Sequence, residues 1–243
     1  MHPSGHHVAI TGGSRGIGLA LAEKFLSEGN AVLLIARDAE RLAEVTAKAP
    51  RFRTLAADLA EADEIDRVAR AIAADFPGLD VLINNAGVHH MGDLADDVTS
   101  RDMVTEIAVN VTAPVILTQK LLPILRQNPP AAVVNVSSTL AFLPKQSAPV
   151  YCGSKAFIRT FSRSLRYQQE AKGVRVFDLI PPAVDTDMMA GRAVPKMAPA
   201  ELAERFWGCW CADKFDAPIG RVRRLMWLNR LAPGLARRKF RNI

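Results

Sequence analysis

The 243-residue sequence predicts an α/β fold in which helices cover both faces of a doubly wound parallel sheet. Short apolar runs alternate with amphipathic stretches, and this alternation predicts parallel strands joined by right-handed helical crossovers. The runs are rich in Val, Ile and Leu without strict alternation, as in strands covered on both faces. With 49% hydrophobic residues and no internal repeat or linker, we expect one domain over residues 1–243.

The periodicity gives a coarse map of the elements. Predicted strands span residues 7–11, 31–36, 52–57, 81–84, 132–136 and 174–180, and predicted helices span 17–28, 39–47, 61–76, 111–126 and 150–170. Asp38 is predicted to cap the second helix, and Gly29 to end the first. From about Pro195 the pattern is less regular, and we expect one or two helices over a cleft.

Composition limits the class of protein. No run of eighteen apolar residues appears, so no membrane-crossing helix is expected, and the N-terminus lacks the pattern of a secretion signal. Cys152, Cys209 and Cys211 have neither disulfide nor metal-site spacing, and we expect no metal. The Cys-x-Cys beside Trp210 is interpreted as core packing. A reducing, cytoplasmic location is the expectation.

The net charge of +6 is concentrated at the C-terminus. Eight of the 31 basic residues and none of the 25 acidic ones lie in residues 217–243, which we call the basic tail. Three interpretations are open: a solvated, subunit-facing or disordered end, a cationic amphipathic surface for weak contact with an anionic membrane, or a contact for an acidic protein such as an acyl carrier protein. No nucleic-acid motif accompanies the charge, so nucleic acid is not expected as a partner.

A glycine loop follows the first predicted strand. In the run from Thr11 to Gly18, Gly12, Gly16 and Gly18 fit a tight turn, close approach to a pyrophosphate and close helix–strand packing. Because the loop follows a strand and opens a helix, it predicts a Rossmann-type dinucleotide site rather than a simple turn.

The end of the second predicted strand indicates which dinucleotide binds. It carries no carboxylate at the position that would hold the ribose of NAD, Arg37 follows that position, and Arg15 in the glycine loop can point to the same place. Two guanidinium groups suit a 2′-phosphate, so NADP(H) is favoured over NAD(H). In the alternative, Arg37 is a solvated charge and Asp38 reaches the ribose.

Tyr151 and Lys155 lie four residues apart, one turn apart on one helix face. An ammonium beside a phenol favours the phenolate, so we expect the pKa of Tyr151 to fall from about 10 toward neutrality. Such a tyrosine can exchange a proton with a carbonyl or an alcohol.

The motifs from residue 7 to about 190 resemble the classical short-chain dehydrogenase/reductase family. The resemblance implies a catalytic tetrad of Asn110, Ser138, Tyr151 and Lys155. It implies adenine contacts from Asp58-Leu59, a strand-four signature in Asn84 to Gly87, and a segment closing on the nicotinamide from Pro181 to Thr186. The expected cofactor-binding residues are Gly12, Ser14, Arg15, Gly16, Ile17, Gly18, Arg37, Asp58, Leu59, Asn85, Ala86, Gly87, Tyr151, Lys155, Pro181, Val184 and Thr186.

Two departures from the family pattern are visible. Pro181-Pro182 stands where the family usually has Pro-Gly, and the chain is expected to lack the usual C-terminal strand ending in glycines. Both features look similar to a bacterial subgroup named after an oxidoreductase of the D-alanyl-lipoteichoic-acid operon. The resemblance implies a homodimer or a tetramer.

Several residues keep a second interpretation. Ser137 and Ser138 could both be strand-end hydroxyls, and Ser138 is chosen by its thirteen-residue distance from Tyr151. Asn110 could cap a helix, Asn84 is interpreted as structural, and His89 and His90 as loop residues. Met188, Met189, Trp207 and Trp210 could line a substrate pocket or pack a lid.

In the implied chemistry, Ser138 and Tyr151 converge on a substrate oxygen. Lys155 lowers the pKa of the tyrosine and hydrogen-bonds the nicotinamide ribose, and Asn110 holds a water that connects Lys155 to solvent. The leading hypothesis is an NADPH-dependent oxidoreductase acting on a small carbonyl or secondary alcohol. A 3-oxoacyl-carrier-protein reductase is an alternative. A non-catalytic NADP(H)-binding sensor or scaffold is a third hypothesis, against which the complete tetrad argues.

Overall fold

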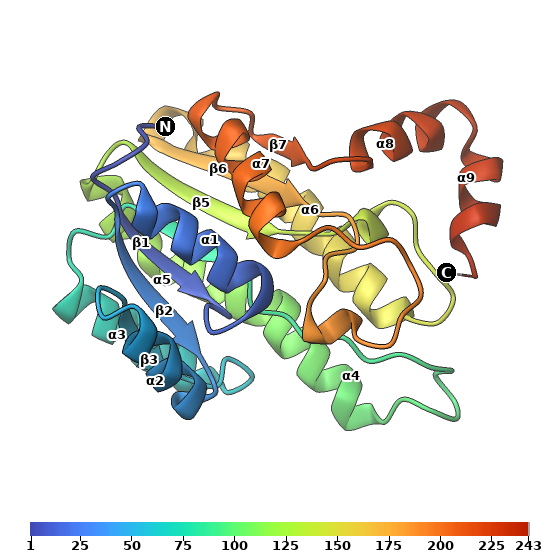
Figure 1. Ribbon diagram of the computed structural model, residues 1–243, viewed down its shortest axis with the longest axis horizontal. Coiled ribbons are helices and arrows are strands. Elements are labelled where there is room, and N and C mark those ends of the chain that lie inside the picture. The colour runs from blue at the N-terminus through green and yellow to red at the C-terminus, as the bar shows by residue number, and fades with distance from the viewer. Residues whose placement is uncertain (243) are drawn as a thin grey trace.

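The computed structural model describes residues 1–242 and contains a seven-stranded parallel sheet with helices on both faces (Figure 1). The spatial order of the strands is β3-β2-β1-β4-β5-β6-β7, which confirms the predicted doubly wound sheet. The strands are β1 (His7–Thr11), β2 (Ala31–Ala36), β3 (Arg53–Ala56), β4 (Val81–Asn84), β5 (Ala131–Val136), β6 (Val174–Ile180) and β7 (Asp216–Pro218). The order reverses between β1 and β4, the place where doubly wound sheets bind ligands at the carboxyl ends of their strands.

The helices agree with the sequence pattern through residue 76. They are α1 (Gly16–Ser27), α2 (Ala39–Lys48), α3 (Ala62–Asp75), α4 (Ser100–Ile107), α5 (Ala113–Gln127), α6 (Pro149–Gln169), α7 (Pro199–Cys211), α8 (Val222–Leu231) and α9 (Pro233–Phe240). Asp38 caps α2 as predicted, since its carboxylate accepts a hydrogen bond from the Arg41 N–H at 3.0 Å. Gly29 follows α1 with a φ of 86°, a conformation that glycine adopts without strain.

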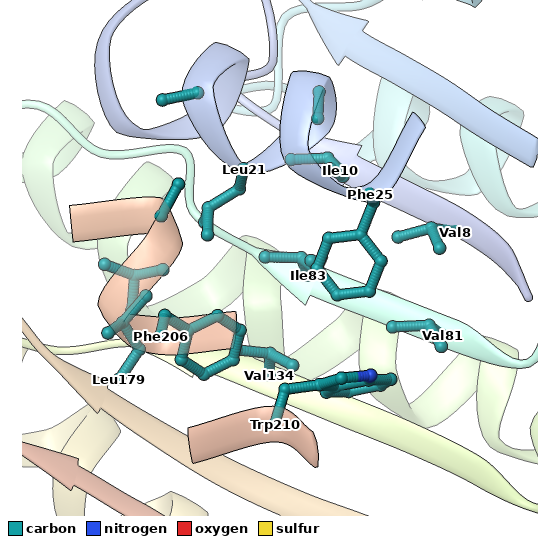
Figure 2. Close-up of a cluster of buried hydrophobic side chains, with 14 of the residues drawn as sticks. Val8, Ile10, Leu21, Phe25, Val81, Ile83, Val134, Leu179, Phe206 and Trp210 are labelled. Carbon is teal, nitrogen blue, oxygen red and sulfur yellow. The ribbon is translucent and has the colours of Figure 1, made fainter. Parts of the chain in front are cut away.

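Two apolar clusters, one on each face, hold the layers together. Side chains of α1, α2 and α7 cover one face, and those of α3, α5 and α6 cover the other. Figure 2 shows the first cluster, in which Phe25 of α1 and Phe206 and Trp210 of α7 meet over β1, β4, β5 and β6. The Phe25 ring makes edge-on contacts with Trp207 and Trp210 at centroid distances of 5.0 and 5.2 Å.

The helix predicted over residues 111–126 begins earlier than expected. Helical backbone runs from Ser100 through α4, a π-helical turn η1 (Ala108–Thr112) and α5. The missed signal was the capping box at Thr99, whose hydroxyl accepts from the Asp102 N–H while the Asp102 carboxylate accepts from the Thr99 N–H. By length and composition the whole run could cross a membrane, but its α5 part packs its apolar side chains against the sheet in the second cluster.

The C-terminal region corrects two expectations. A seventh strand is present, since β7 pairs in parallel with β6, and we predicted none because three residues containing Asp and Pro give no apolar run. The helix α7 packs beside α1 rather than over a cleft, so Trp207 and Trp210 belong to the core. Cys209 packs against the same cluster, whereas Cys211 is exposed, so core packing was wrong for Cys211.

The basic tail forms two helices that project from the sheet (Figure 1). Its end returns to the loop before α6, where the Gln146 N–H donates to the Arg241 carbonyl at 3.0 Å. The tail therefore reaches a loop that leads directly into α6, the helix that carries Tyr151.

We expect Trp210→Ala to lower the free energy of unfolding by about 3–5 kcal/mol, because it leaves a cavity among aromatic rings in the core. The indole is fully buried and its N–H donates to the His2 carbonyl. Urea unfolding measures the change. Trp227→Ala is the matched control: that side chain is 55% exposed, so we expect a change within about 0.5 kcal/mol. Equal losses in the two variants would contradict the placement of α7.

Candidate active site

A cleft of about 750 Å³ opens at the carboxyl ends of β1, β2, β4 and β5. It follows from the sheet topology, because loops leaving β1 and β4 turn in opposite directions and leave a gap between them. Most of its lining comes from the glycine loop, the ends of β2 and β3, the loop after β4, the start of α6 and the segment after β6.

Hydrogen bonds between the ends of β1 and β4 shape the floor of the cleft. The Thr11 hydroxyl accepts from the N–H groups of Asn85 and Ala86, both at 3.0 Å. The Asn85 amide donates to the carbonyls of Thr11 and Gly12 at 2.9 and 3.1 Å. These bonds hold the glycine loop against the strand-four signature, so the two walls keep a fixed separation.

The glycine loop has the geometry of a phosphate cradle. A Cβ at Gly18 would lie 2.2 Å from the Gly12 carbonyl oxygen, so helix α1 can pack this closely only without a side chain there. Gly16 has a φ of 57°, and Arg15 caps α1 without a side-chain hydrogen bond to its first turn. The first N–H groups of α1 therefore face the cleft region with the positive end of the helix dipole, which suits a pyrophosphate.

Three arginines gather where a ribose phosphate of a dinucleotide would lie. Arg15, Arg37 and Arg41 all line the cleft, and Arg15 and Arg41 both bind one oxygen of Asp187, at 2.7 and 3.2 Å. Arg37 lies 3.7 Å from the Asp58 carboxylate. Arg41 was not predicted, although its position in the first turn of α2, directly after the end of β2, was a usable signal. These residues fit a bound dinucleotide with a 2′-phosphate.

Helix α6 places Tyr151 and Lys155 on its cleft side. The Lys155 ammonium lies 5.7 Å from the Tyr151 ring centroid and donates to the Val136 carbonyl at 2.9 Å. Burial lowers the pKa of Lys155 to about 8. Burial also raises the pKa of Tyr151 above its ordinary value, although a hydrogen bond with Ser138 acts in the opposite direction.

The raised pKa of Tyr151 corrects the expectation from sequence. Spacing alone suggested that Lys155 would favour the phenolate, but loss of water around the phenol outweighs the charge of the lysine. The structure therefore presents a protonated phenol at neutral pH.

The two candidate serines have different environments. The Ser137 hydroxyl donates to the buried Asp178 carboxylate at 2.5 Å, and Asp178 also pairs with Arg159 at 2.9 Å. Burial raises the pKa of Asp178 to about 6. Ser138 instead accepts from the Leu140 N–H, and its hydroxyl acts to lower the pKa of Tyr151. Ser138 is thus the serine that acts on the Tyr151 phenol, whereas Ser137 is the one that lines the cleft.

Asn110 lies in the π-helical turn behind the cleft and does not cap a helix. Its amide oxygen accepts from the Val88 N–H at 2.9 Å, and its amide nitrogen donates to the Val88 carbonyl at 2.9 Å and to the Ser154 hydroxyl at 3.2 Å. The side chain therefore fixes the strand-four loop against α6. A π-helical turn is often found at a functional position.

Most of the predicted cofactor residues line the cleft. Those that do are Gly12, Ser14, Arg15, Gly16, Ile17, Arg37, Asp58, Leu59, Asn85, Ala86, Gly87, Tyr151, Lys155, Pro181 and Thr186. Gly18 packs against Gly12 instead, and Val184 is buried in the first apolar cluster. Neither residue lines the cleft. Asn84 has the structural role we preferred, since its amide bonds Thr118 and Asn135.

The substrate end of the cleft is formed around His89 and Met188. The His89 ring stacks on Tyr151 with a centroid distance of 4.2 Å, so it is more than a solvated loop histidine. Glu106 is fully buried, its carboxylate accepts from the His90 N–H at 3.3 Å, and burial raises its pKa. Glu106 was not predicted as a site residue, because its contact with His90 depends on how α4 packs.

This fold and this cleft define a nucleotide-dependent oxidoreductase of the α/β type. The family model for short chain dehydrogenases matches residues 6–195, and the chain belongs to that family. A curated relative, the uncharacterized oxidoreductase DltE of Bacillus subtilis strain 168, is 39% identical over 190 residues, which cover 77% of this chain and 75% of that protein.

Solved structures share the fold over nearly the whole chain. A short chain dehydrogenase from Burkholderia cenocepacia J2315 in complex with NADP has a TM-score of 0.88 at 24% identity and covers 99% of both chains. A short-chain dehydrogenase from Sphingobium yanoikuyae in complex with NADPH has a TM-score of 0.83 at 27% identity and covers 96% of this chain and 95% of that one.

We expect Tyr151 to ionise above pH 10 in the free protein, because burial disfavours the phenolate. The sequence contains two tyrosines, so Tyr167→Phe leaves Tyr151 as the only phenol. Phenolate absorbance near 295 nm, followed as pH rises, reports its ionisation directly. Tyr151→Phe gives the background. Ionisation of Tyr151 well below pH 10 would contradict the dominance of burial.

Proposed function

We propose that this chain is an NADP(H)-dependent oxidoreductase that interconverts a carbonyl compound and a secondary or primary alcohol, with Tyr151 as the acid and base. The observation that carries the proposal is the meeting of Tyr151, Ser138 and Lys155 beside a dinucleotide-shaped cleft. When bound, the nicotinamide supplies or accepts the hydride.

The residues have distinct tasks in the reduction. Ser138 donates a hydrogen bond to the substrate oxygen and stabilises the negative charge that develops there. The protonated Tyr151 phenol transfers its proton to the same oxygen, which becomes the alcohol. Lys155 holds a positive charge close to the phenolate that results, and Asn110 fixes the loop and helix that carry these groups. In the oxidation, the same groups act in reverse.

The preference for NADP(H) rests on the arginines and on the relative crystallised with NADPH. Arg15, Arg37 and Arg41 provide guanidinium groups at the end of β2, where an NAD-specific site would carry a carboxylate. Guanidinium groups can form bidentate, charge-assisted bonds to a 2′-phosphate, which supports this preference.

Two further features of the proposal concern assembly and location. We propose a homodimer or a tetramer, as is usual in the family, and a cytoplasmic location, which the free state of Cys152, Cys209 and Cys211 supports. Light scattering measures the first, and fractionation of cells the second.

A second candidate function is reduction of a 3-oxoacyl group on a carrier protein. The basic tail favours it, because the tail carries eight positive charges and its end bonds Gln146 in the loop leading into α6. The same charges would also support weak contact with an anionic membrane. Faster reduction of acetoacetyl-carrier protein than of acetoacetyl-coenzyme A would favour the carrier protein.

We expect Tyr151→Phe to lower kcat/KM for carbonyl reduction at least about 100-fold, because the proton donor is lost. NADPH oxidation with a panel of aldehydes and ketones measures the rate, and binding of NADPH by fluorescence should persist. Tyr167→Phe is the matched control, since that side chain is 69% exposed and we expect no change. Wild-type turnover in Tyr151→Phe would refute the assigned acid.

We expect Arg37→Ala/Arg41→Ala to weaken NADPH binding about tenfold and to leave NADH binding nearly unchanged, because only NADPH carries the 2′-phosphate. Fluorescence titration with both cofactors gives the ratio of dissociation constants. Arg70→Ala, an exposed arginine outside the cleft lining, controls for net charge. An equal loss for both cofactors would contradict recognition of the 2′-phosphate.

A further inference from the structure

Two cations, Lys145 and Arg192, lie near the His89 ring that stacks on Tyr151. Lys145 is only 6% exposed, and its ammonium has one hydrogen-bond acceptor, the Met91 sulfur at 3.4 Å. The Arg192 guanidinium donates to the Met189 sulfur at 3.1 Å and to the His89 Nδ1 at 3.3 Å. Among residues 1–242 no carboxylate oxygen lies within 4.0 Å of either group.

Thioether sulfur is a weak acceptor, so these two charges are poorly compensated. Burying a cation without a good partner is costly, and proteins usually pair such groups. The three arginines of the cleft each face a carboxylate, since Arg15 and Arg41 bind Asp187 and Arg37 faces Asp58. Lys155 has a carbonyl oxygen as its acceptor, so Lys145 and Arg192 differ from these groups in having sulfur acceptors.

His89 adds a third donor at the same place. A guanidinium can only donate, so the His89 Nδ1 must accept from Arg192 and the proton of the neutral ring must be on Nε2. Burial, followed by the charges of Lys145 and Arg192, lowers the pKa of His89 to about 3, which keeps the ring neutral. The buried Nε2 has no acceptor among the described residues.

We propose that Lys145, Arg192 and His89 bind an anionic group of the substrate, so that the enzyme acts on short carbonyl compounds that carry a carboxylate or a sulfonate. This inference rests on the proposed function and specifies its substrate class. The His89 ring stacks on Tyr151, so an anion held by these donors lies a few bonds from the carbonyl that Tyr151 protonates.

The cover over this subsite can move. Met91 is 41% exposed, and its unbranched side chain can swing away from Lys145 to admit an oxygen ligand. The Glu106 carboxylate accepts from the His90 N–H, and burial favours the neutral form of this group. The basic tail ends at Gln146, next to Lys145, and its positive potential attracts anions toward the subsite.

Matched pairs of substrates test the proposal. With saturating NADPH, succinic semialdehyde and acetoacetate are each compared with their methyl esters, which keep the carbonyl and lose the charge. We expect kcat/KM to be at least tenfold higher for the acids. Lys145→Met and Arg192→Met should each reduce this acid-to-ester ratio at least fivefold, and Lys145→Arg should restore most of it. Lys172→Met, an exposed lysine, is the matched control and should leave the ratio unchanged.

A competition measurement tests the anionic subsite with a compound that the enzyme does not reduce. Succinate, which has no carbonyl to reduce, should compete with the methyl ester of succinic semialdehyde in the wild type and compete at least fivefold less well in Lys145→Met. Esters reduced as well as acids, with no competition by succinate, would overturn the anionic subsite and leave the proposed function intact. No turnover of any carbonyl compound, together with normal NADPH binding, would instead overturn the proposed function.

Discussion

The tie between the ends of β1 and β4 is the constraint on which the rest of the site depends. Asn85 bonds the carbonyls of Thr11 and Gly12, and the Thr11 hydroxyl accepts two N–H groups in return. Because the strand order reverses there, no crossover helix fills the gap between the two strands. The tie keeps this gap open at a fixed width. The glycine loop, the arginines and helix α6 are then positioned around it.

Burial sets the charge states around the cleft more strongly than neighbouring charges do. It keeps the Tyr151 phenol protonated, brings the pKa of Lys155 to about 8 and keeps His89 neutral. A protonated phenol beside a hydroxyl donor is prepared to deliver a proton to a substrate oxygen. The same low polarity makes the buried Lys145 ammonium, whose acceptor is a thioether sulfur, costly, and the proposed anionic substrate would offset that cost.

The sequence predicted the residues that act through local spacing. The glycine loop, the Tyr151–Lys155 turn and the choice of Ser138 follow from short-range patterns. The structure brings the glycine loop, Tyr151 and Lys155 to one cleft, and Ser138 acts on Tyr151. The sequence could not predict the raised pKa of Tyr151, because the burial of this side chain depends on everything that packs around α6. It also missed Arg41, Glu106 and the Lys145–Arg192 pair, whose partners lie far away in the chain.

By itself, the sequence determined the parallel sheet, six of its strands within one residue at each end, and the identity of the dinucleotide loop, because apolar periodicity and glycine positions are local properties of the chain. Only the tertiary structure decided that α7 belongs to the core, that a short β7 extends the sheet and that Val184 is buried away from the cleft. Those outcomes depend on packing between helices and strands that are distant in the sequence. An aromatic run such as that of α7 has the same local pattern whether the helix forms a lid or belongs to the core.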